Sequence, residues 1–371
     1  MTNGLMIGLS AMILFPLVCL MTIMPLLTRK IESFGVTVPE QAQGDASIVK
    51  LRRQYVWLNA GAGVILTASL MWWSKTGGSE ERWATLLIVH VFGYLLLSFA
   101  VYLKQHNAVK RMKEQKGWLT DQTQRIMAST SFRNQKLVLS SYWFIPHAIV
   151  ILATVVICLV NYDAFPNQIP MKYDLDGTVV RSIDKTYVAV LWQSMVQSFL
   201  LLVFILGNLS IGWSKQVVEG ANPEASLIRN RKFRRYWSTY MVVSGFALIA
   251  SFALIPIGLL LEWHANTNIY SILAIALFML VYAIVLSIVA GQGGSRIKLT
   301  SGEGTGQSKP MADQDQYWKL GQIYFNPHDP SLFVEKRFGI GWTMNFAKPI
   351  VWVIMVALLA APFVIVFIVE S

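Results

Sequence analysis

The sequence has few charged residues and almost no cysteine. Of its 371 residues, 14% are charged, whereas 54% are apolar. Soluble domains carry about a quarter charged residues, so this chain lacks the polar surface that a water-soluble protein of its length needs. Its two cysteines, Cys19 and Cys158, are too few for a disulfide-based scaffold or a zinc site. The composition therefore predicts an integral membrane protein.

Several long apolar stretches contain no Asp, Glu, Lys or Arg. Each has roughly 20 residues or more, which is enough to cross ~30 Å of hydrocarbon as an α-helix. We therefore predict an all-α polytopic membrane protein with about eight transmembrane helices. The expected spans are 4–27, 55–74, 83–103, 141–161, 188–213, 238–261, 269–291 and 349–369.

Lys and Arg gather in alternate connecting segments. Segments 28–54, 104–140, 214–237 and 292–348 contain 26 of the 31 basic residues, and the other connections contain five. Because basic segments stay on the cytoplasmic side during insertion, both termini are expected outside. The same distribution accounts for the net charge of +11, so no nucleic-acid partner is predicted. The expected location is a bacterial plasma membrane, with membrane lipids as partners.

No linker divides the chain into separate soluble domains. Paired Arg residues followed by aromatics recur in KLRRQYVW at 50–57 and KFRRYW at 232–237. They indicate either a duplication of two four-helix halves or ordinary interfacial anchoring. The predicted units are an N-terminal membrane region over 1–140, two helices with their external loop over 141–213, two helices over 214–291, a flexible cytoplasmic tether over 292–316, a cytoplasmic β-hairpin-like element over 317–349 and the last helix over 350–371.

Motifs for catalysis are absent or misplaced. DLDGTV at 174–179 matches the Asp-x-Asp-Gly-Thr motif of haloacid-dehalogenase phosphatases, but it lies in a predicted external loop of 26 residues. Such a loop cannot build a doubly wound sheet, so a solvated turn is predicted instead. We expect no catalytic residues, no metal and no cofactor, and hence no enzyme. Polar residues inside the spans are expected to bond neighbouring helices, or alternatively to line a cavity. They are His90, His147, Gln193, Gln197 and Asn208.

The external segment 162–187, YDAFPNQIPMKYDLDGTVVRSIDKTY, contains two prolines followed by Gly and Lys. It resembles a bacterial module, roughly Leu-Pro-x-x-Ile-Pro-x-His and then Gly and Lys, that also occurs in SdpI-type immunity proteins. Lys172 stands where that family usually has His, and Ser182 stands where it usually has an aromatic residue. The resemblance implies that this loop receives a peptide toxin or another envelope ligand. The candidate binding residues are Pro166, Pro170, Lys172, Asp174, Asp176, Gly177, Arg181 and Lys185.

The segment 317–349, YWKLGQIYFNPHDPSLFVEKRFGIGWTMNFAKP, resembles a cytoplasmic domain of unknown function. QIYF and LFVEKR alternate apolar and polar residues like short strands, with NPHDP as the turn between them. Lys336 and Arg337 are expected to meet anionic lipid. The segment is predicted to be a structural hairpin at the membrane surface or a binding site for a ligand or regulator protein. The candidate residues are Trp318, Gly321, Asn326, Pro327, Asp329, Pro330, Lys336, Arg337, Trp342 and Asn345.

Together, these features predict a non-enzymatic membrane protein, namely a sensor or toxin-immunity-type protein of the bacterial envelope. A transporter or permease component is the alternative, supported by the number of spans and by the two similar halves. A third hypothesis is a lipid-acting membrane enzyme that uses His90, His147 or His264 as a base, although no motif supports it.

Overall fold

The computed structural model describes residues 2–76, 79–118, 136–217, 223–299 and 314–370. Within these ranges, eight helices are long and apolar enough to cross a membrane. The prediction of a multi-pass, mostly helical membrane protein is therefore confirmed. The helices are α1 (Thr2–Leu27), α2 (Ala46–Thr76), α3 (Glu80–Gln115), α4 (Ile145–Val160), α5 (Tyr187–Trp213), α6 (Pro223–Leu260), α7 (Ala265–Ala290) and α8 (Pro349–Glu370).

Hydroxyl side chains fix the starts of two of these helices. The Ser79 hydroxyl accepts a hydrogen bond from the backbone nitrogen of Arg82 at the start of α3. The Thr186 hydroxyl accepts one from the nitrogen of Ala189 at the start of α5. Such N-caps satisfy backbone donors that have no partner within the helix. Both helices therefore begin where the apolar run meets a polar external segment.

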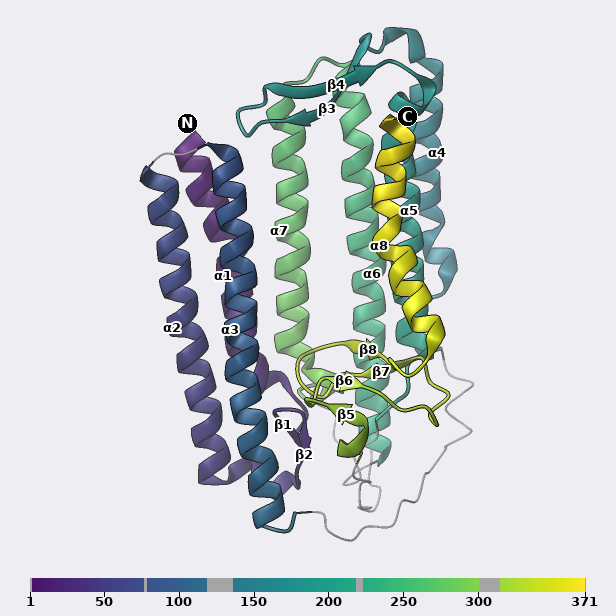
Figure 1. The fold of residues 1–371 in the computed structure, drawn as a ribbon. Helices are drawn as coiled ribbons and strands as arrows, with labels where there is room; N and C mark the ends of the chain where they lie inside the picture. Colours follow the sequence, from purple (N-terminus) through teal and green to yellow (C-terminus); the bar gives the residue numbers. More distant parts are fainter. Residues whose placement is uncertain (1, 77–78, 119–135, 218–222, 300–313, 371) are drawn as a thin grey trace.

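The helices pack as two bundles (Figure 1). One bundle contains α1, α2 and α3. In the other, α4, α5 and α6 pack together, α7 lies against α6, and α8 lies against α5. The bundles also meet where α1 contacts α7. This division into three and five helices differs from the two four-helix halves expected of a duplication.

Both termini lie at one end of the molecule, as an even number of passes requires (Figure 1). The long hairpin of β3 (Gln168–Tyr173) and β4 (Val179–Asp184) lies at the same end. By the distribution of Lys and Arg, this end is expected to be external and the opposite end cytoplasmic, and the two ends are named accordingly. The short strands at the cytoplasmic end are β1 (Glu32–Ser33), β2 (Val36–Thr37), β5 (Trp318–Lys319), β6 (Ile323–Tyr324), β7 (Phe333–Glu335) and β8 (Trp342–Met344).

Polar side chains inside the second bundle bond one helix to another, as predicted. Gln197 of α5 donates to the carbonyl of Ile249 on α6 at 2.9 Å. Asn208 of α5 accepts from the Ser238 hydroxyl of α6 at 2.5 Å and donates to the carbonyl of Leu139, before α4, at 3.0 Å. The Nε2 atom of His147 on α4 lies 3.0 Å from a carbonyl oxygen of α6. These bonds pair the polar atoms that make them, which would otherwise be costly to bury, while the Gln197 Oε1 and His147 Nδ1 atoms are buried without a hydrogen bond to any described residue.

The cytoplasmic segment before α8 forms two hairpins, which corrects the prediction that QIYF pairs with LFVEKR. β5 pairs with β6, and β7 pairs with β8. Each hairpin has its own glycine-containing turn: Gly321 has φ +69°, and Gly339 and Gly341 have φ +90° and +101°. NPHDP connects the two hairpins instead of closing one. Period-two alternation identifies strands but not their partners, because the turns decide which strands meet.

Candidate functional site

The cytoplasmic hairpin domain, residues 314–348, is held together by three of the predicted site residues. Asp329 accepts hydrogen bonds from the Lys215 ammonium at 2.6 Å and from the Tyr324 hydroxyl at 2.8 Å. Asn345 accepts from the backbone nitrogen of Asn326 at 3.0 Å and donates to its carbonyl at 2.8 Å. Asn326, Asp329 and Asn345 are all buried. They lie close together, and their polar atoms bond other residues of the domain and, from Asp329, Lys215 between α5 and α6.

The ionisation of this cluster follows from its surroundings. Burial alone would raise the pKa of Asp329, but hydrogen bonds from Lys215 and from the Ser331 backbone outweigh it and lower that pKa. The Tyr324 pKa is raised because the ring is buried and the hydroxyl donates to Asp329. The carboxylate is therefore ionised and the phenol neutral at neutral pH.

A buried ionic network joins the domain to both helix bundles. The Glu335 side chain on β7 is fully buried, with 0% exposure. It pairs with Arg234 of α6, whose Nη2 atom lies 2.8 Å away, and with Arg29, which follows α1. Asn230 of α6 also donates to Glu335 at 2.7 Å. One carboxylate thus connects the first bundle, the second bundle and the hairpin domain.

Arg337 joins the domain to the first bundle by a second route. Its guanidinium pairs with Asp315, lies 3.9 Å from Glu32 and stacks over the Trp318 ring at 5.2 Å. Because Arg337 is buried, its predicted contact with anionic lipid is wrong. Asp315 also binds Lys113 of α3 at 2.7 Å. Its pKa falls to about 2, because the two cations outweigh the effect of burial.

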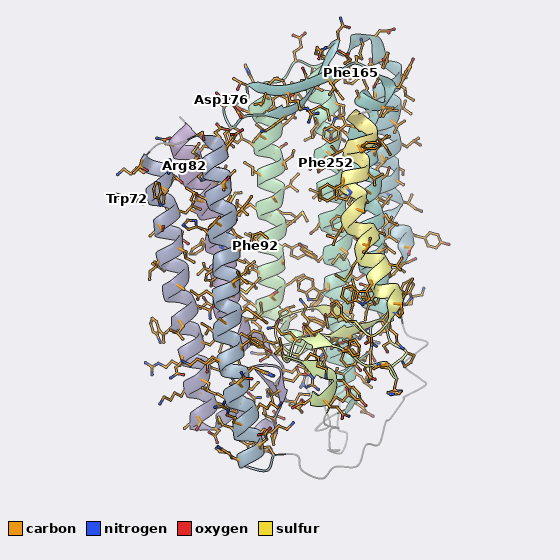
Figure 2. The ribbon with its side chains drawn as sticks, in the orientation of Figure 1. Trp72, Arg82, Phe92, Phe165, Asp176 and Phe252 are labelled. Atoms are coloured by element: carbon orange, nitrogen blue, oxygen red, sulfur yellow. The ribbon has the colours of Figure 1, made fainter. Side chains whose placement is uncertain are left out.

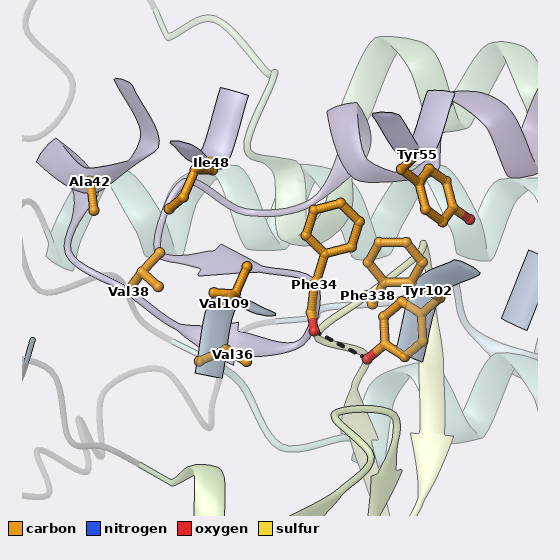
Figure 3. Packing of buried hydrophobic residues seen from close by; sticks show 9 residues of the cluster. All are labelled: Phe34, Val36, Val38, Ala42, Ile48, Tyr55, Tyr102, Val109 and Phe338. Carbon is orange, nitrogen blue, oxygen red and sulfur yellow. Dashed lines mark hydrogen bonds between the residues drawn. The ribbon is translucent and has the colours of Figure 1, made fainter. Parts of the chain in front are cut away.

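An aromatic cluster packs between the hairpin domain and the first bundle (Figure 3). The ring of Phe338 from the hairpin domain lies 4.5 Å from Tyr102, 5.7 Å from Phe34 and 5.8 Å from Tyr55, centroid to centroid. The hydroxyl of Tyr102 lies 3.2 Å from the carbonyl oxygen of Phe34 and 2.9 Å from that of Leu320. The side chain of Phe338 therefore fills a pocket made by α2, α3 and the segment between α1 and α2.

Two glycines allow the backbones to approach at this junction. Gly35 has φ +75°, and a Cβ atom there would lie 2.5 Å from the carbonyl oxygen of Gly321. Gly321 has φ +69°, and a Cβ atom there would lie 2.5 Å from the Tyr102 hydroxyl. Any larger residue would clash with atoms of the opposite segment. The predicted site residue Gly321 is thus required for close packing.

The other predicted residues of this domain lie at its edges. Trp342 packs against Phe233 of α6 with ring centroids 5.2 Å apart. Pro327 and Pro330 are exposed, as is Lys336. The residues that sequence reasoning missed are the buried charges and their partners outside the domain. Those residues are Arg29, Glu32, Lys113, Lys215, Asn230 and Arg234, with Glu335 inside it.

The external β3–β4 hairpin is the second candidate site. Its tip is the DLDGTV segment, which forms the predicted turn with Gly177 at φ +88°. The Asp176 carboxylate accepts hydrogen bonds from the nitrogen and hydroxyl of Thr178 at 3.0 and 2.8 Å. Backbone and side-chain bonds from Thr178 lower the Asp176 pKa. The turn is thus an exposed, ionised end to the hairpin.

This tip reaches the first helix bundle (Figure 2). The backbone nitrogen of Leu175 donates to the Glu80 carboxylate at the start of α3, at 2.8 Å. Gly177 lies close to the side chain of Asn266 at the start of α7. The hairpin emerges between α4 and α5 and crosses α7 before it meets α3. It therefore links the two bundles outside, as the hairpin domain links them inside.

The base of the hairpin is anchored, and its middle is exposed. Lys185 donates to the carbonyl of Phe165 at 2.9 Å and lies over the Tyr162 ring at 5.3 Å. Lys172 and Arg181 are exposed and face each other across the two strands. Of the predicted residues here, Lys185 and the half-buried Pro170 support the base, and Pro166 is exposed beside them. Lys172, Arg181 and Asp176 are accessible from outside, and Asp174 is half-buried.

The histidines proposed as bases do not share a site. His90 lies 3.3 Å from the Ser69 hydroxyl of α2, His147 contacts α6, and His264 is exposed before α7. Among the residues that the structure describes, no three His, Cys, Asp or Glu side chains are grouped to hold a metal ion.

Comparison with known proteins identifies one segment of the chain. Residues 327–352 match a family of unknown function, DUF5808. The matched residues run from the turn between the two cytoplasmic hairpins into α8. The predicted resemblance of this region to a domain of unknown function is confirmed. No curated protein and no solved structure matches the chain significantly.

Proposed function

We propose that the protein is a non-enzymatic sensor or toxin-immunity-type protein of the bacterial envelope. Its β3–β4 hairpin receives an external peptide or another envelope ligand. The observation that supports this function is the hydrogen bond from Leu175 to Glu80 at 2.8 Å, which joins the hairpin to the other helix bundle. A ligand that displaces the hairpin changes contacts to both bundles at once.

The acidic tip of the hairpin suits an extended cationic peptide, although Lys172 and Arg181 lie exposed between the tip and the base. Asp176 at the tip follows Leu175, which bonds Glu80 at the start of α3, and the two carboxylates attract positive charge. Val179 and Val180 are about half exposed, at 52% and 49%. Neither outer edge of the hairpin pairs with another described strand. A peptide can therefore add to an edge through main-chain hydrogen bonds, with apolar contacts to the valines.

The immunity part of the proposal rests on the resemblance of the loop to the SdpI-type module. Its shared residues are Pro166, Ile169, Pro170, Gly177, Arg181 and Lys185. In the hairpin, Ile169 is buried, and Lys185 bonds the carbonyl of Phe165. The shared residues thus include supports of the hairpin base. A regulator protein at the cytoplasmic end is the partner that a sensing role requires.

The transporter alternative has less support. A translocation path would be lined by Gln193, Gln197, Asn208 and His90, and the amide nitrogens of Gln197 and Asn208 donate to backbone carbonyls of neighbouring segments. Opening a polar path along them would break these bonds in a low-dielectric environment, where unpaired polar groups are costly. Both residues therefore favour a packed bundle.

The proposed function is tested by deleting the gene in its host and challenging the cells with the host's own toxic peptides. Deletion should raise sensitivity to at least one of them. Complementation with wild-type protein should restore resistance, whereas Asp174→Asn/Asp176→Asn, which removes the two acidic charges of the tip, should not. Glu262→Gln, at an exposed external position between α6 and α7, is the control and should restore resistance.

Two results would overturn the proposal. One is unchanged sensitivity of the deletion strain to every peptide tested. The other is full resistance with the hairpin variant at wild-type abundance in the membrane.

A further inference from the structure

A basic pocket lies at the cytoplasmic end of α6, apart from both sites described above. Its volume is about 590 Å³, and its walls are Lys136, Arg231, Lys232, Arg235 and Tyr236. Four of these five side chains are cationic. They come from two separate parts of the chain, the start of α6 and the segment that precedes α4.

The two faces of this part of α6 carry different interactions. Asn230 and Arg234 lie one turn apart on the inner face, and both bond Glu335. Arg231 and Arg235 also lie one turn apart, so they share the next face of the helix. Arg231 and Arg235 are exposed, whereas Asn230 and Arg234 are buried. The pocket is therefore separate from the ionic network that holds the hairpin domain.

Neighbouring contacts place the pocket at the membrane boundary. Three residues after Lys136, the backbone nitrogen of Leu139 donates to the Ser238 hydroxyl of α6 at 2.8 Å. Ser238 begins the charge-free run of α6. The exposed aromatics Tyr142 and Trp143 precede α4, and such residues collect at headgroup depth. Lys136 is thus held beside the α6 cations where the apolar surface begins.

We propose that this pocket binds the phosphate headgroup of an anionic phospholipid from the cytoplasmic leaflet. Guanidinium groups match the geometry of phosphate oxygens, and the Tyr236 hydroxyl is an additional donor at the pocket wall. Basic pockets between helices on this side of a membrane suit such headgroups. Arg231 and Lys232 also interact within the chain. The site therefore depends on the convergence of cations, not on an unpaired charge.

Native mass spectrometry of the full-length protein in a neutral detergent tests the proposal. The protein is titrated with phosphatidylglycerol, with phosphatidylcholine, and with inorganic phosphate alone. Lys136→Gln/Arg235→Gln removes two pocket charges. Lys104→Gln/Lys110→Gln removes two exposed charges from the cytoplasmic end of α3 and is the matched control. The unfolding midpoint without lipid verifies that each variant is folded.

We expect phosphatidylglycerol to bind the wild-type protein more tightly than phosphatidylcholine does. The pocket variant should lose about 30-fold in affinity for phosphatidylglycerol, which is roughly one quarter of the binding free energy of a micromolar complex. The control variant should bind as the wild type does. Equal losses in both variants would overturn the proposal, because they would indicate general surface attraction. Binding of inorganic phosphate without binding of phosphatidylglycerol would overturn the lipid assignment.

Discussion

Removal of the buried negative charge of Glu335 should destabilise the protein strongly. Glu335 lies 2.8 Å from the nearest Arg234 nitrogen, and both side chains are fully buried. At an effective dielectric constant of about 20, the Coulomb energy at that distance is about 6 kcal/mol. The cost of burying the charges offsets part of this energy. Glu335→Gln leaves Arg234 buried without its carboxylate and takes one of two carboxylates from Arg29, which keeps Glu32 at 3.7 Å, so the expected loss is about 3–5 kcal/mol of unfolding free energy.

The matched control is Glu40→Gln, which changes the same chemical group on the surface. Glu40 pairs with Lys30 at 3.3 Å, but the two side chains are 46% and 67% exposed. Exposed pairs contribute less than about 1 kcal/mol, so this change should have little effect. Both variants are measured by tryptophan-fluorescence unfolding in detergent with increasing denaturant. If the two variants lose the same small free energy, Glu335 does not join the bundles as described.

Other predictions test the aromatic cluster, the acidic network and the sidedness. Phe338→Ala should lower the free energy of unfolding by about 3–5 kcal/mol, because it empties the pocket between α2 and α3. Phe325→Ala, which removes a ring that is 44% exposed, should lower it far less. Equal losses in the two variants would contradict the described packing of Phe338. The Asp315 pKa is about 2, below the ordinary 3.8, so its contribution of about 2 kcal/mol is complete above pH ~4 and disappears as the pH falls towards 2. The unfolding free energy of Asp315→Asn, measured as a function of pH, should lack that acid-dependent loss. A pH dependence identical to that of the wild type would refute the role of the Asp315 carboxylate. With both native cysteines replaced, an impermeant maleimide should label Lys172→Cys in intact cells but Arg111→Cys only after lysis; labelling of both in intact cells would reject the proposed sidedness.

The membrane spans could be predicted because the apolar interior of a bilayer restricts which residues a spanning helix can contain. A helix in hydrocarbon cannot expose charge, so the charge-free runs correspond to the spans, and alternate basic segments give the orientation. The buried ions could not be predicted in this way. KFRRYW indicates interfacial arginines, yet Arg234 is buried beside Glu335 and Arg235 is exposed in the basic pocket. Their difference arises from the hairpin domain, which covers one face of α6 and contributes its carboxylate from 101 residues away.

The two links between the bundles constrain how a signal can cross the membrane. Outside, the hairpin tip meets α3 through the hydrogen bond from Leu175 to Glu80, a contact that a ligand can replace. Inside, Glu335, Arg337 and Phe338 join the bundles through buried ion pairs and packed rings. Breaking one buried pair costs about 3–5 kcal/mol, whereas coupling between two sites is typically about 1–3 kcal/mol. Under the proposed function, a ligand would therefore release the external contact and tilt the bundles about an intact cytoplasmic junction.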